Sequence, residues 1–275
     1  TLLIYDLPVK LSVLGKCCII HCGIIPEGLD YLNKALTNID IVGAKEIKNG
    51  FPFESYRFLL LDESHRFYSS QYDLLIEQTK DKRITTIFSY DENQVLSQSE
   101  QRAEIAKKIE GISGCKTYRL TNKIRTNKEL ASFIERLRDL HSHNIVNDYS
   151  SVTLVYAKDT SEASLLLENF TQNGYTFINY TSSSYYPTTF DCYNAFCQGR
   201  NTHTVIGQEF EKVVMILDRT FAYDQDGKLR AIVHPNPNYL YRQLLFQGIS
   251  RVREKLAIIV VDNPDVFAKV LSILE

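Results

Sequence analysis

The stretch RFLLLDESHR, residues 57–66, decides the fold class of this chain. Its four consecutive apolar residues, 58–61, show no polar alternation, which is typical of a short strand buried on both faces. Such strands belong to parallel sheets that helices cover on both sides. The strand runs directly into two adjacent acids, Asp62 and Glu63. Because ligands bind at the carboxyl ends of parallel strands, these acids lie where a functional site is expected.

The segments around this stretch alternate between strand-like and helix-like patterns. In the first part of the chain, the patterns predict strands at 17–22, 57–62 and 84–91, and helices at 3–14, 26–39, 70–80 and 99–111. In the second part, they predict strands at 116–120, 151–157, 175–181, 212–218 and 255–262, helices at 126–140 and 161–170, and a long loop at 182–202. Strands separated by helix-length segments need crossover connections, which predicts parallel sheets flanked by helices.

The length of the chain predicts two domains. At 275 residues, the chain fits two compact domains of roughly 100 to 150 residues each. The strand and helix pattern starts again after 111–115, so the first domain is predicted at 1–113 and the second at 114–275.

Composition narrows the class of protein. The net charge of −2 and the pI near 6.3 require any nucleic-acid contact to come from a local basic groove, which argues against a protein that coats DNA. The six cysteines show no CxxC spacing, so we interpret them as reduced, mostly buried thiols of a cytoplasmic protein. No apolar run approaches the roughly 20 residues that cross a bilayer, so no membrane association is predicted.

The paired acids suit one particular chemistry. Phosphoanhydride hydrolysis uses one carboxylate to hold Mg²⁺ and another to orient or deprotonate the attacking water. Asp62 and Glu63 can share these tasks, although a solvated strand terminus explains this stretch equally well when it is taken alone.

Four further stretches carry polar residues at positions that suit a nucleotide site. They are FSYDENQ (88–94) with Asp91 and Gln94, LTNKIRTNKEL (120–130) with Arg125, THTVIGQEFEKVVMIL (202–217) with Gly207 and Glu209, and FQGISRVREKLAIIV (246–260) with Arg251 and Arg253. An arginine at a helix entry can meet an anion together with the helix amides. Taken singly, each stretch also has a plain structural reading as a helix cap, a turn glycine or a solvated basic face.

The order of these stretches resembles superfamily 1 helicases, and most closely the Schlafen-type DNA/RNA helicase domain, a group of P-loop ATPases related to UvrD-like enzymes. LLLDESHR resembles the Walker B motif, FSYDENQ the next helicase motif, and LTNKIRTN the motif that supplies an arginine. TVIGQEFEKVV resembles T-x-x-G-x-E-F, and ISRVREKL resembles the final T-R-A-R-x-x-L motif with Ser250 in place of threonine. The resemblance covers nearly the whole chain and implies two RecA-like P-loop NTPase domains.

The resemblance also implies a function and a role for each matched residue. The function is that of an ATP-dependent DNA or RNA helicase or translocase, which hydrolyses ATP at the cleft between the two domains. Asp62 would hold Mg²⁺, and Glu63 would activate water. Gln94 would couple the γ-phosphate to the nucleic-acid site. Arg125 and Arg251 would stabilise the charge on the phosphoryl group during its transfer, and Glu209 would contact the ribose. Gly207 belongs to the same ATP-binding motif as Glu209.

One motif of this family is absent from the 275 residues. The phosphate-binding loop, G-x-x-x-x-G-K-[ST], is not found, although Thr1 stands where the Mg²⁺-binding hydroxyl would follow that loop. Three explanations stay open: the chain is a fragment, the loop lies in a segment upstream of Thr1, or the protein has lost the loop. The alternative function is therefore a catalytically weak helicase-like module that acts as a nucleotide switch or through protein contacts. A Rossmann-type enzyme is disfavoured because the chain has no G-x-G-x-x-G turn.

The predicted partner is single-stranded DNA or RNA, and further domains or protein partners are left open. Single-strand grooves combine stacked aromatic rings with cations. The candidates are Tyr185, Tyr186, Phe190, Tyr193, Arg200 and His203. Core or loop packing is the favoured interpretation for each aromatic residue taken singly, because the chain has 17 tyrosines and no tryptophan.

Overall fold

The chain forms two compact units, each built around its own parallel sheet. The computed structural model describes residues 2–23, 25, 33–34, 36–80, 83–119, 127–183, 186–232 and 238–275. The first unit is Thr1–Arg119 and the second is Leu120–Glu275. The sequence-based boundary at 113/114 lies a few residues earlier in the chain.

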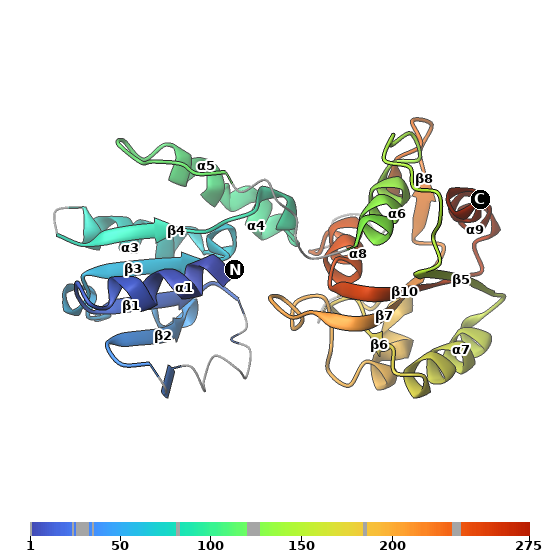
Figure 1. The fold of residues 1–275 in the computed structure, drawn as a ribbon, viewed down its shortest axis with the longest axis horizontal. Coiled ribbons are helices and arrows are strands. Elements are labelled where there is room, and N and C mark those ends of the chain that lie inside the picture. Colours follow the sequence, from blue (N-terminus) through green and yellow to red (C-terminus); the bar gives the residue numbers. More distant parts are fainter. Residues whose placement is uncertain are drawn as a thin grey trace. The chain divides into compact units, whose positions relative to one another are not determined.

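The first unit is a four-stranded sheet in the order β2-β1-β3-β4, with all neighbours parallel (Figure 1). Its strands are β1 (Cys17–His21), β2 (Ile39–Gly43), β3 (Phe58–Asp62) and β4 (Thr85–Phe88). Its helices are α1 (Leu2–Leu11), α3 (Ser69–Thr79), α4 (Gln98–Ala103) and α5 (Ile105–Glu110), with short 3-10 turns at Ala44–Glu46, Phe53–Ser55, Ser64–Arg66 and Glu92–Gln94.

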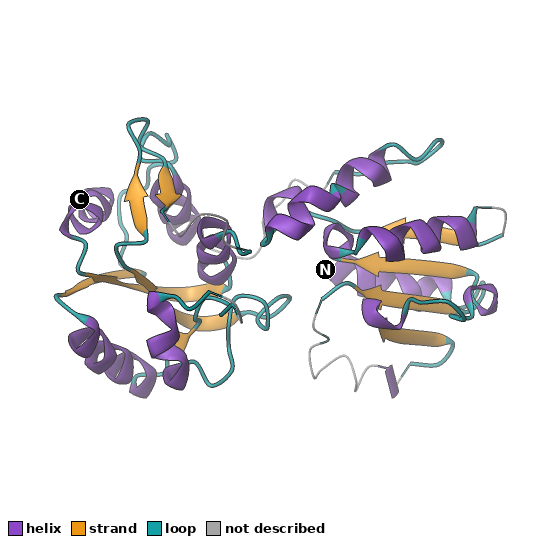
Figure 2. Cartoon of the chain, turned by 180° about the vertical axis from the view of Figure 1, so that it is seen from behind, coloured by secondary structure: helices purple, strands orange, loops and turns teal. Residues whose placement is uncertain are grey.

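Alternate residues of the central strands build two separate cores, one on each face of this sheet. Cys17, Ile19 and Leu60 pack with residues of α1. Their sequence neighbours, such as Ile20 and Leu59, pack on the other face with residues of α3 and α5. Figures 1 and 2 show α1 and α3 on these opposite faces. Because both faces are covered, the strands need apolar residues at every position, which is the pattern of 58–61.

The second unit has a four-stranded parallel sheet in the order β5-β10-β7-β6. Its strands are β5 (Val152–Ala157), β6 (Thr176–Phe177), β7 (Phe210–Leu217) and β10 (Val252–Val261), and an antiparallel hairpin is formed by β8 (Phe221–Tyr223) and β9 (Leu229–Ala231). Its helices are α6 (Lys128–Arg138), α7 (Thr160–Gln172), α8 (Tyr241–Ile249) and α9 (Pro264–Leu274), with a 3-10 helix at Thr189–Phe196.

Helices cover both faces of the second sheet as well. Figure 1 shows α6, α8 and α9 on one face and α7 on the other. The two central strands, β7 and β10, are the most deeply buried, with every residue of 213–217 and 256–260 fully enclosed. The fold class predicted from the sequence, α/β with parallel sheets flanked by helices, is confirmed.

Several local predictions differ from the structure. Residues 116–119 form no strand, because all four side chains are exposed and a strand without burial gains nothing from pairing. The helix predicted at 99–111 is broken at Glu104, which has a φ of 46° and separates α4 from α5. The predicted loop 182–202 contains the 3-10 helix Thr189–Phe196. Most of the predicted helix 26–39 lies outside the described residues, and Ile39 begins β2 instead.

Four of the six cysteines, at 17, 18, 22 and 197, are buried, and all six are free thiols. Within the described ranges, no helix has both the length and the apolar character that crossing a bilayer requires.

Candidate functional site

The carboxyl edge of the first sheet brings two polar side chains into contact inside the protein. His21 ends β1 and Asp62 ends β3, and the two residues are paired across the parallel strands. His21 Nδ1 lies 3.4 Å from Asp62 Oδ2. The hydroxyl of Tyr5, on α1, lies 3.2 Å from the same imidazole nitrogen. Both His21 and Asp62 are 1% exposed, so this contact is enclosed.

Asp62 is a buried carboxylate that is poorly compensated. Neither of its carboxylate oxygens has a hydrogen-bond partner of standard geometry among the described residues. Its polar neighbours are the His21 imidazole at 3.4 Å and the Tyr5 hydroxyl, whose pKa is raised by burial and then by the charge of Asp62. An ionised group without partners is costly inside a protein, and such groups are normally paired or bound to a metal. One carboxylate at a strand end fits Mg²⁺, which keeps several waters and takes few protein ligands.

Glu63 holds a backbone conformation that is unfavourable for its residue type. Its φ of 55° and ψ of 37° lie in the left-handed region, which costs a non-glycine residue about 1–2 kcal/mol. This turn links β3 to the 3-10 turn Ser64–Arg66, and both the amide and the hydroxyl of Ser64 donate to the carbonyl of Ser89 beyond β4. Strained residues of this kind persist where the surrounding structure holds them, and they cluster at active sites.

His65 lies beside Glu63 as a neutral imidazole. Burial, and then the charge of Arg66, lower the pKa of His65 to about 3. The backbone amide of Asp91 donates to His65 Nδ1 at 3.3 Å, so the imidazole proton is on Nε2. That nitrogen lies 3.6 Å from Glu63 Oε2, just beyond normal hydrogen-bond distance. A small movement would let a neutral histidine orient the glutamate without adding charge.

This histidine makes the stability of the protein depend on pH. The folded protein resists protonation of His65 down to about pH 3, whereas the unfolded chain binds that proton below about pH 6.5. Stability therefore falls as the pH falls through this window, by about 2 kcal/mol between roughly pH 7 and pH 5 from this group. We expect His65→Gln to flatten the pH dependence of the urea unfolding free energy by this amount. An equal dependence of the unfolding free energy on pH in the wild type and in His65→Gln would contradict the assignment of a neutral, buried His65.

Arg66 connects Glu63 to the turn that carries Gln94. Its Nε lies 3.7 Å from Glu63 Oε2, and its Nη2 donates to the carbonyl of Gln94 at 3.0 Å. Its Nη1 contacts Glu100 Oε1 at 3.4 Å, and the other oxygen of Glu100 accepts from the amide of Leu96. The Gln94 side chain donates to Asp91 Oδ2 at 3.0 Å. Four of the residues named from sequence therefore belong to one linked cluster in the first unit: Asp62, Glu63, Asp91 and Gln94.

The sequence-based residues of the second unit meet at the starts of β7 and β10. Gly207 has a φ of 78° in the turn before β7, a conformation that suits glycine. The amide of Phe210 donates to the carbonyl of Arg251 at 2.9 Å, which places Glu209 beside the arginine segment. Arg253 Nε lies 3.8 Å from Glu209 Oε2. Arg251 itself is 2% exposed, and its guanidinium contacts the carbonyl and the side chain of Gln247.

Two residues named from sequence, Thr1 and Arg125, lie outside the described residues. Of the aromatic cluster, Tyr185 is also outside them. Phe190 and Tyr193 are buried, as the packing interpretation expects, and Tyr186 is 48% exposed.

Sequence reasoning missed His21 and Tyr5. His21 had a usable signal, because it closes the apolar run CCIIH just as Asp62 closes FLLLD. Tyr5 had no such signal, because in the sequence it resembles any other apolar residue of a predicted helix.

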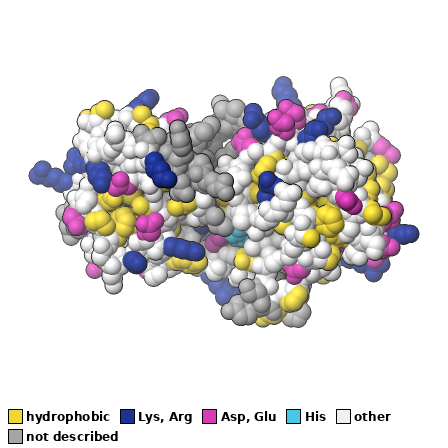
Figure 3. All heavy atoms as spheres, turned by 90° about the horizontal axis from the view of Figure 1, so that it is seen from below, with side chains coloured by type: hydrophobic (Ala, Val, Ile, Leu, Met, Phe, Trp, Pro, Cys, Tyr) yellow, Lys and Arg dark blue, Asp and Glu magenta, His cyan; other side chains and the backbone are white. Residues whose placement is uncertain are grey.

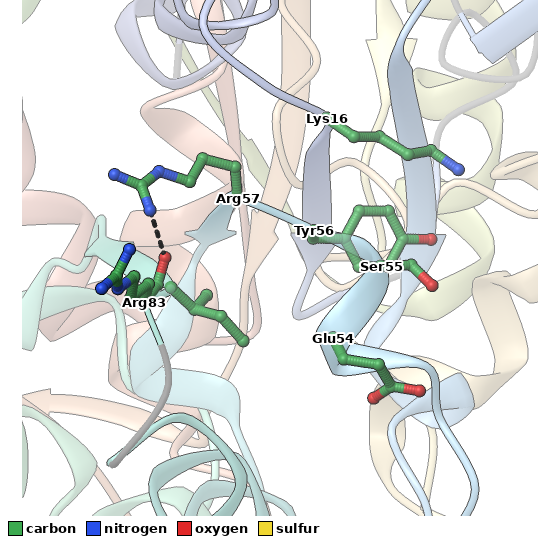
Figure 4. Close-up of a pocket in the computed structure, with 7 residues that line it drawn as sticks. Lys16, Glu54, Ser55, Tyr56, Arg57 and Arg83 are labelled. Atoms are coloured by element: carbon green, nitrogen blue, oxygen red, sulfur yellow. Dashed lines mark hydrogen bonds between the residues drawn. The ribbon is translucent and has the colours of Figure 1, made fainter.

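An open hollow at the opposite, amino-terminal edge of the first sheet is separate from this cluster. Lys16, Glu54, Ser55, Tyr56, Arg57, Arg83 and Ile84 line it (Figure 4). Lys16 is paired with Asp40 at 2.8 Å, and Arg57 donates to the carbonyl of Arg83 at 2.9 Å. The cationic groups of Lys16 and Arg57 therefore already have partners within the protein.

Comparison with known proteins finds likenesses among solved structures. No protein-family model and no curated protein matches the chain. Among solved structures, a variant of S. cerevisiae Dbp5 bound to Nup159, a Gle1 variant, IP6 and ADP is 13% identical, with a TM-score of 0.38 over 94% of this chain and 67% of that one. A hypothetical ATP-dependent RNA helicase from Sulfolobus tokodaii is 12% identical, with a TM-score of 0.26 over 97% of this chain and 86% of that one. Likenesses this weak assign no role to any residue.

Proposed function

We propose that this chain belongs to an ATP-dependent nucleic-acid motor of the superfamily 1, Schlafen-type helicase kind, with its hydrolytic centre at Asp62 and Glu63. The observation that carries the proposal is the buried Asp62 carboxylate, whose two oxygens lack standard partners among the described residues at the carboxyl edge of a parallel sheet. The strained Glu63 that follows it supports the same assignment. The predicted cytoplasmic location and single-stranded DNA or RNA partner are parts of this proposal.

Each residue of the cluster has a defined task in this proposal. Asp62 holds Mg²⁺, which when bound neutralises charge on the phosphates of ATP. Glu63 accepts a proton from the attacking water or orients it. After a small movement that closes the 3.6 Å gap, the neutral His65 would orient the Glu63 carboxylate without adding a positive charge. Arg66 links the position of Glu63 to the turn of Gln94, the residue that the family resemblance assigns to sensing the γ-phosphate.

The roles of the second unit come from the sequence resemblance. Glu209 would contact the sugar, Gly207 would shape its turn, and Arg125 and Arg251 would stabilise the transferring charge. For Arg251 this role requires rearrangement, because its guanidinium is buried against Gln247. RecA-like character for both units is part of the same proposal.

A nucleotide-switch or interaction module is the second candidate function. One observation favours it: the guanidinium of Arg251, which the motor assignment needs at the transferring phosphate, is buried against Gln247. A module of this kind would bind nucleotide or a partner without turnover.

ATP hydrolysis in the presence of Mg²⁺ separates the two functions. The purified chain is measured with and without single-stranded DNA or RNA, alongside a version with a phosphate-binding loop joined ahead of Thr1. We expect hydrolysis in the loop-bearing protein and its stimulation by one of the two polymers. No hydrolysis in either protein, with or without the strand, would overturn the motor assignment and leave the switch reading.

A further inference from the structure

Three arginines from distant parts of the sequence converge in the second unit. Arg138 ends α6, Arg230 lies on β9, and Arg242 lies in the first turn of α8. Figure 1 shows α6, α8 and the hairpin that contains β8 on the same side of the second sheet. The face drawn in Figure 3 carries basic and acidic side chains in mixture, as the net charge of −2 suggests.

The segments that carry these arginines are fastened to one another. The Tyr223 hydroxyl on β8 donates to the carbonyl of Leu137 on α6 at 2.9 Å, and the amide of Leu140 donates to the carbonyl of Gly227 in the hairpin at 2.9 Å. Helix α8 packs against β9. The elements that carry the three arginines, α6, β9 and α8, are therefore held in fixed positions relative to one another.

Arg138, at the end of α6, contacts the same face of α8 that carries Arg242. The guanidinium of Arg138 lies over the ring of Phe246, 5.8 Å from its centroid. Phe246 follows Arg242 by four residues, and side chains four apart on a helix are neighbours. Arg230 approaches from the hairpin, where its Nε contacts Asp224 Oδ2 at 2.6 Å.

The charges of this group are not balanced. Burial lowers the pKa of Arg242, the charges of Arg138 and Arg230 lower it further, and Asp224 acts in the opposite direction. Asp224 is already engaged, because it accepts from Arg230 and from the backbone amides of Asp226 and Lys228. The one carboxylate of Asp224 therefore contacts Arg230 and also acts on Arg242.

Local structure does not explain the place of Arg242. A cation in the first turn of a helix is opposed by the helix dipole, which instead favours an anion there. The residue before the helix, Leu240, provides no side-chain cap. The Nε of Arg242 is buried and, within the described part of the chain, has no hydrogen-bond partner. A bound anion would satisfy this nitrogen, the helix amides and the excess positive charge together.

We propose that Arg138, Arg230 and Arg242 form a binding site for a phosphate group. Guanidinium groups bind phosphate oxygens through paired, charge-assisted hydrogen bonds, which makes phosphate the matching ligand chemistry. The site is distinct from the Glu209 and Arg251 region, which adjoins the other end of α8, about 13 Å away along the helix. It does not depend on hydrolysis at Asp62 and Glu63. A nucleic-acid backbone and free phosphate both present this chemistry.

The test compares variants of the full chain for binding to a fluorescently labelled single-stranded RNA and DNA, by anisotropy, and to inorganic phosphate, by calorimetry. We expect Arg242→Gln to weaken binding about tenfold, because a lost charge-assisted hydrogen bond has this size. The matched control is Arg219→Gln, which removes an exposed arginine that already has Asp262 as its partner at 2.8 Å. Asp224→Asn should act in the opposite direction and tighten binding, since it removes the carboxylate from the group.

The outcomes separate the two sources of phosphate. Loss of oligonucleotide binding in Arg242→Gln, with a shallower dependence on salt, supports a backbone phosphate. Loss of inorganic phosphate binding alone supports a free phosphate. Arg230→Gln serves as a second variant if Arg242→Gln does not fold, and it is expected to weaken the same ligand. Equal affinities for the wild type, Arg242→Gln and Arg230→Gln toward all three probes would overturn the proposal.

Discussion

Replacement of Glu63 by glutamine is expected to reduce ATP turnover at least about 100-fold in the loop-bearing protein, while leaving nucleotide affinity within about twofold. A positioned general base contributes roughly 10²- to 10⁴-fold to a rate, and glutamine keeps the shape of the side chain but accepts no proton. Nucleotide affinity is retained because Mg²⁺ is assigned to Asp62. Steady-state hydrolysis and binding of a fluorescent nucleotide measure the two effects separately.

Glu104 offers a matched control for this substitution. It is also a glutamate in the left-handed region, with a φ of 46°, but it is exposed and forms its ion pair with Lys107 on α5. Glu104→Gln should leave turnover unchanged. Glu63→Gly distinguishes the effect of the carboxylate from that of the backbone conformation. It should lose turnover as Glu63→Gln does. It should also gain about 1 kcal/mol of stability, because glycine adopts the positive φ without strain. Full turnover in Glu63→Gln would remove this residue from the chemistry.

Replacement of Asp62 by asparagine is expected to stabilise the metal-free protein by about 1–3 kcal/mol and to abolish any stabilisation by Mg²⁺. The buried carboxylate has no hydrogen-bond partner of standard geometry among the described residues and lies 3.4 Å from His21, whereas an asparagine amide brings no charge into the same enclosed position. Mg²⁺ that binds only the folded state raises the unfolding free energy in the wild type, and this gain requires the carboxylate. Urea unfolding with and without Mg²⁺ measures both effects.

Asp40 provides the control of opposite sign. Its carboxylate contacts Lys16 at 2.8 Å and accepts from the Tyr56 hydroxyl at 2.7 Å. Burial opposes ionisation of Asp40, but these partners outweigh it and hold the pKa of Asp40 below its usual value. Asp40→Asn should therefore destabilise the protein and leave the Mg²⁺ effect intact. A destabilised Asp62→Asn that still responds to Mg²⁺ would show that Asp62 is a structural residue.

The candidate site was partly visible in the sequence. Asp62, Glu63 and Gln94 follow strand-like runs, and the ends of parallel strands meet at one edge of a sheet, so the pattern alone predicted that they lie close together. His65 and Arg66 were visible as neighbours in the sequence, but their roles were not. The neutral state of His65 depends first on its burial in the folded protein, and its tautomer depends on the amide of Asp91, which is 26 residues away.

The errors in the fold have a common cause. Residues 116–119 contain residues that favour strands, yet they have no buried surface, and strand propensity mostly expresses packing on a sheet. The hairpin β8–β9 and helix α8 were missed because their segments are short and their apolar residues contact elements far away in the chain. Short-range periodicity carries no information about such partners.

The runs of 17–20, 58–61 and 256–261 were enough to specify buried parallel strands, because residues in the middle of a strand that is covered on both faces are almost always apolar. Their length and spacing then led to two α/β domains. The contact of Tyr5 with His21 and Asp62, and the meeting of Arg138, Arg230 and Arg242, depend on how elements from different parts of the chain pack. Long-range packing sets the burial and charge of such polar groups, and local sequence does not encode it.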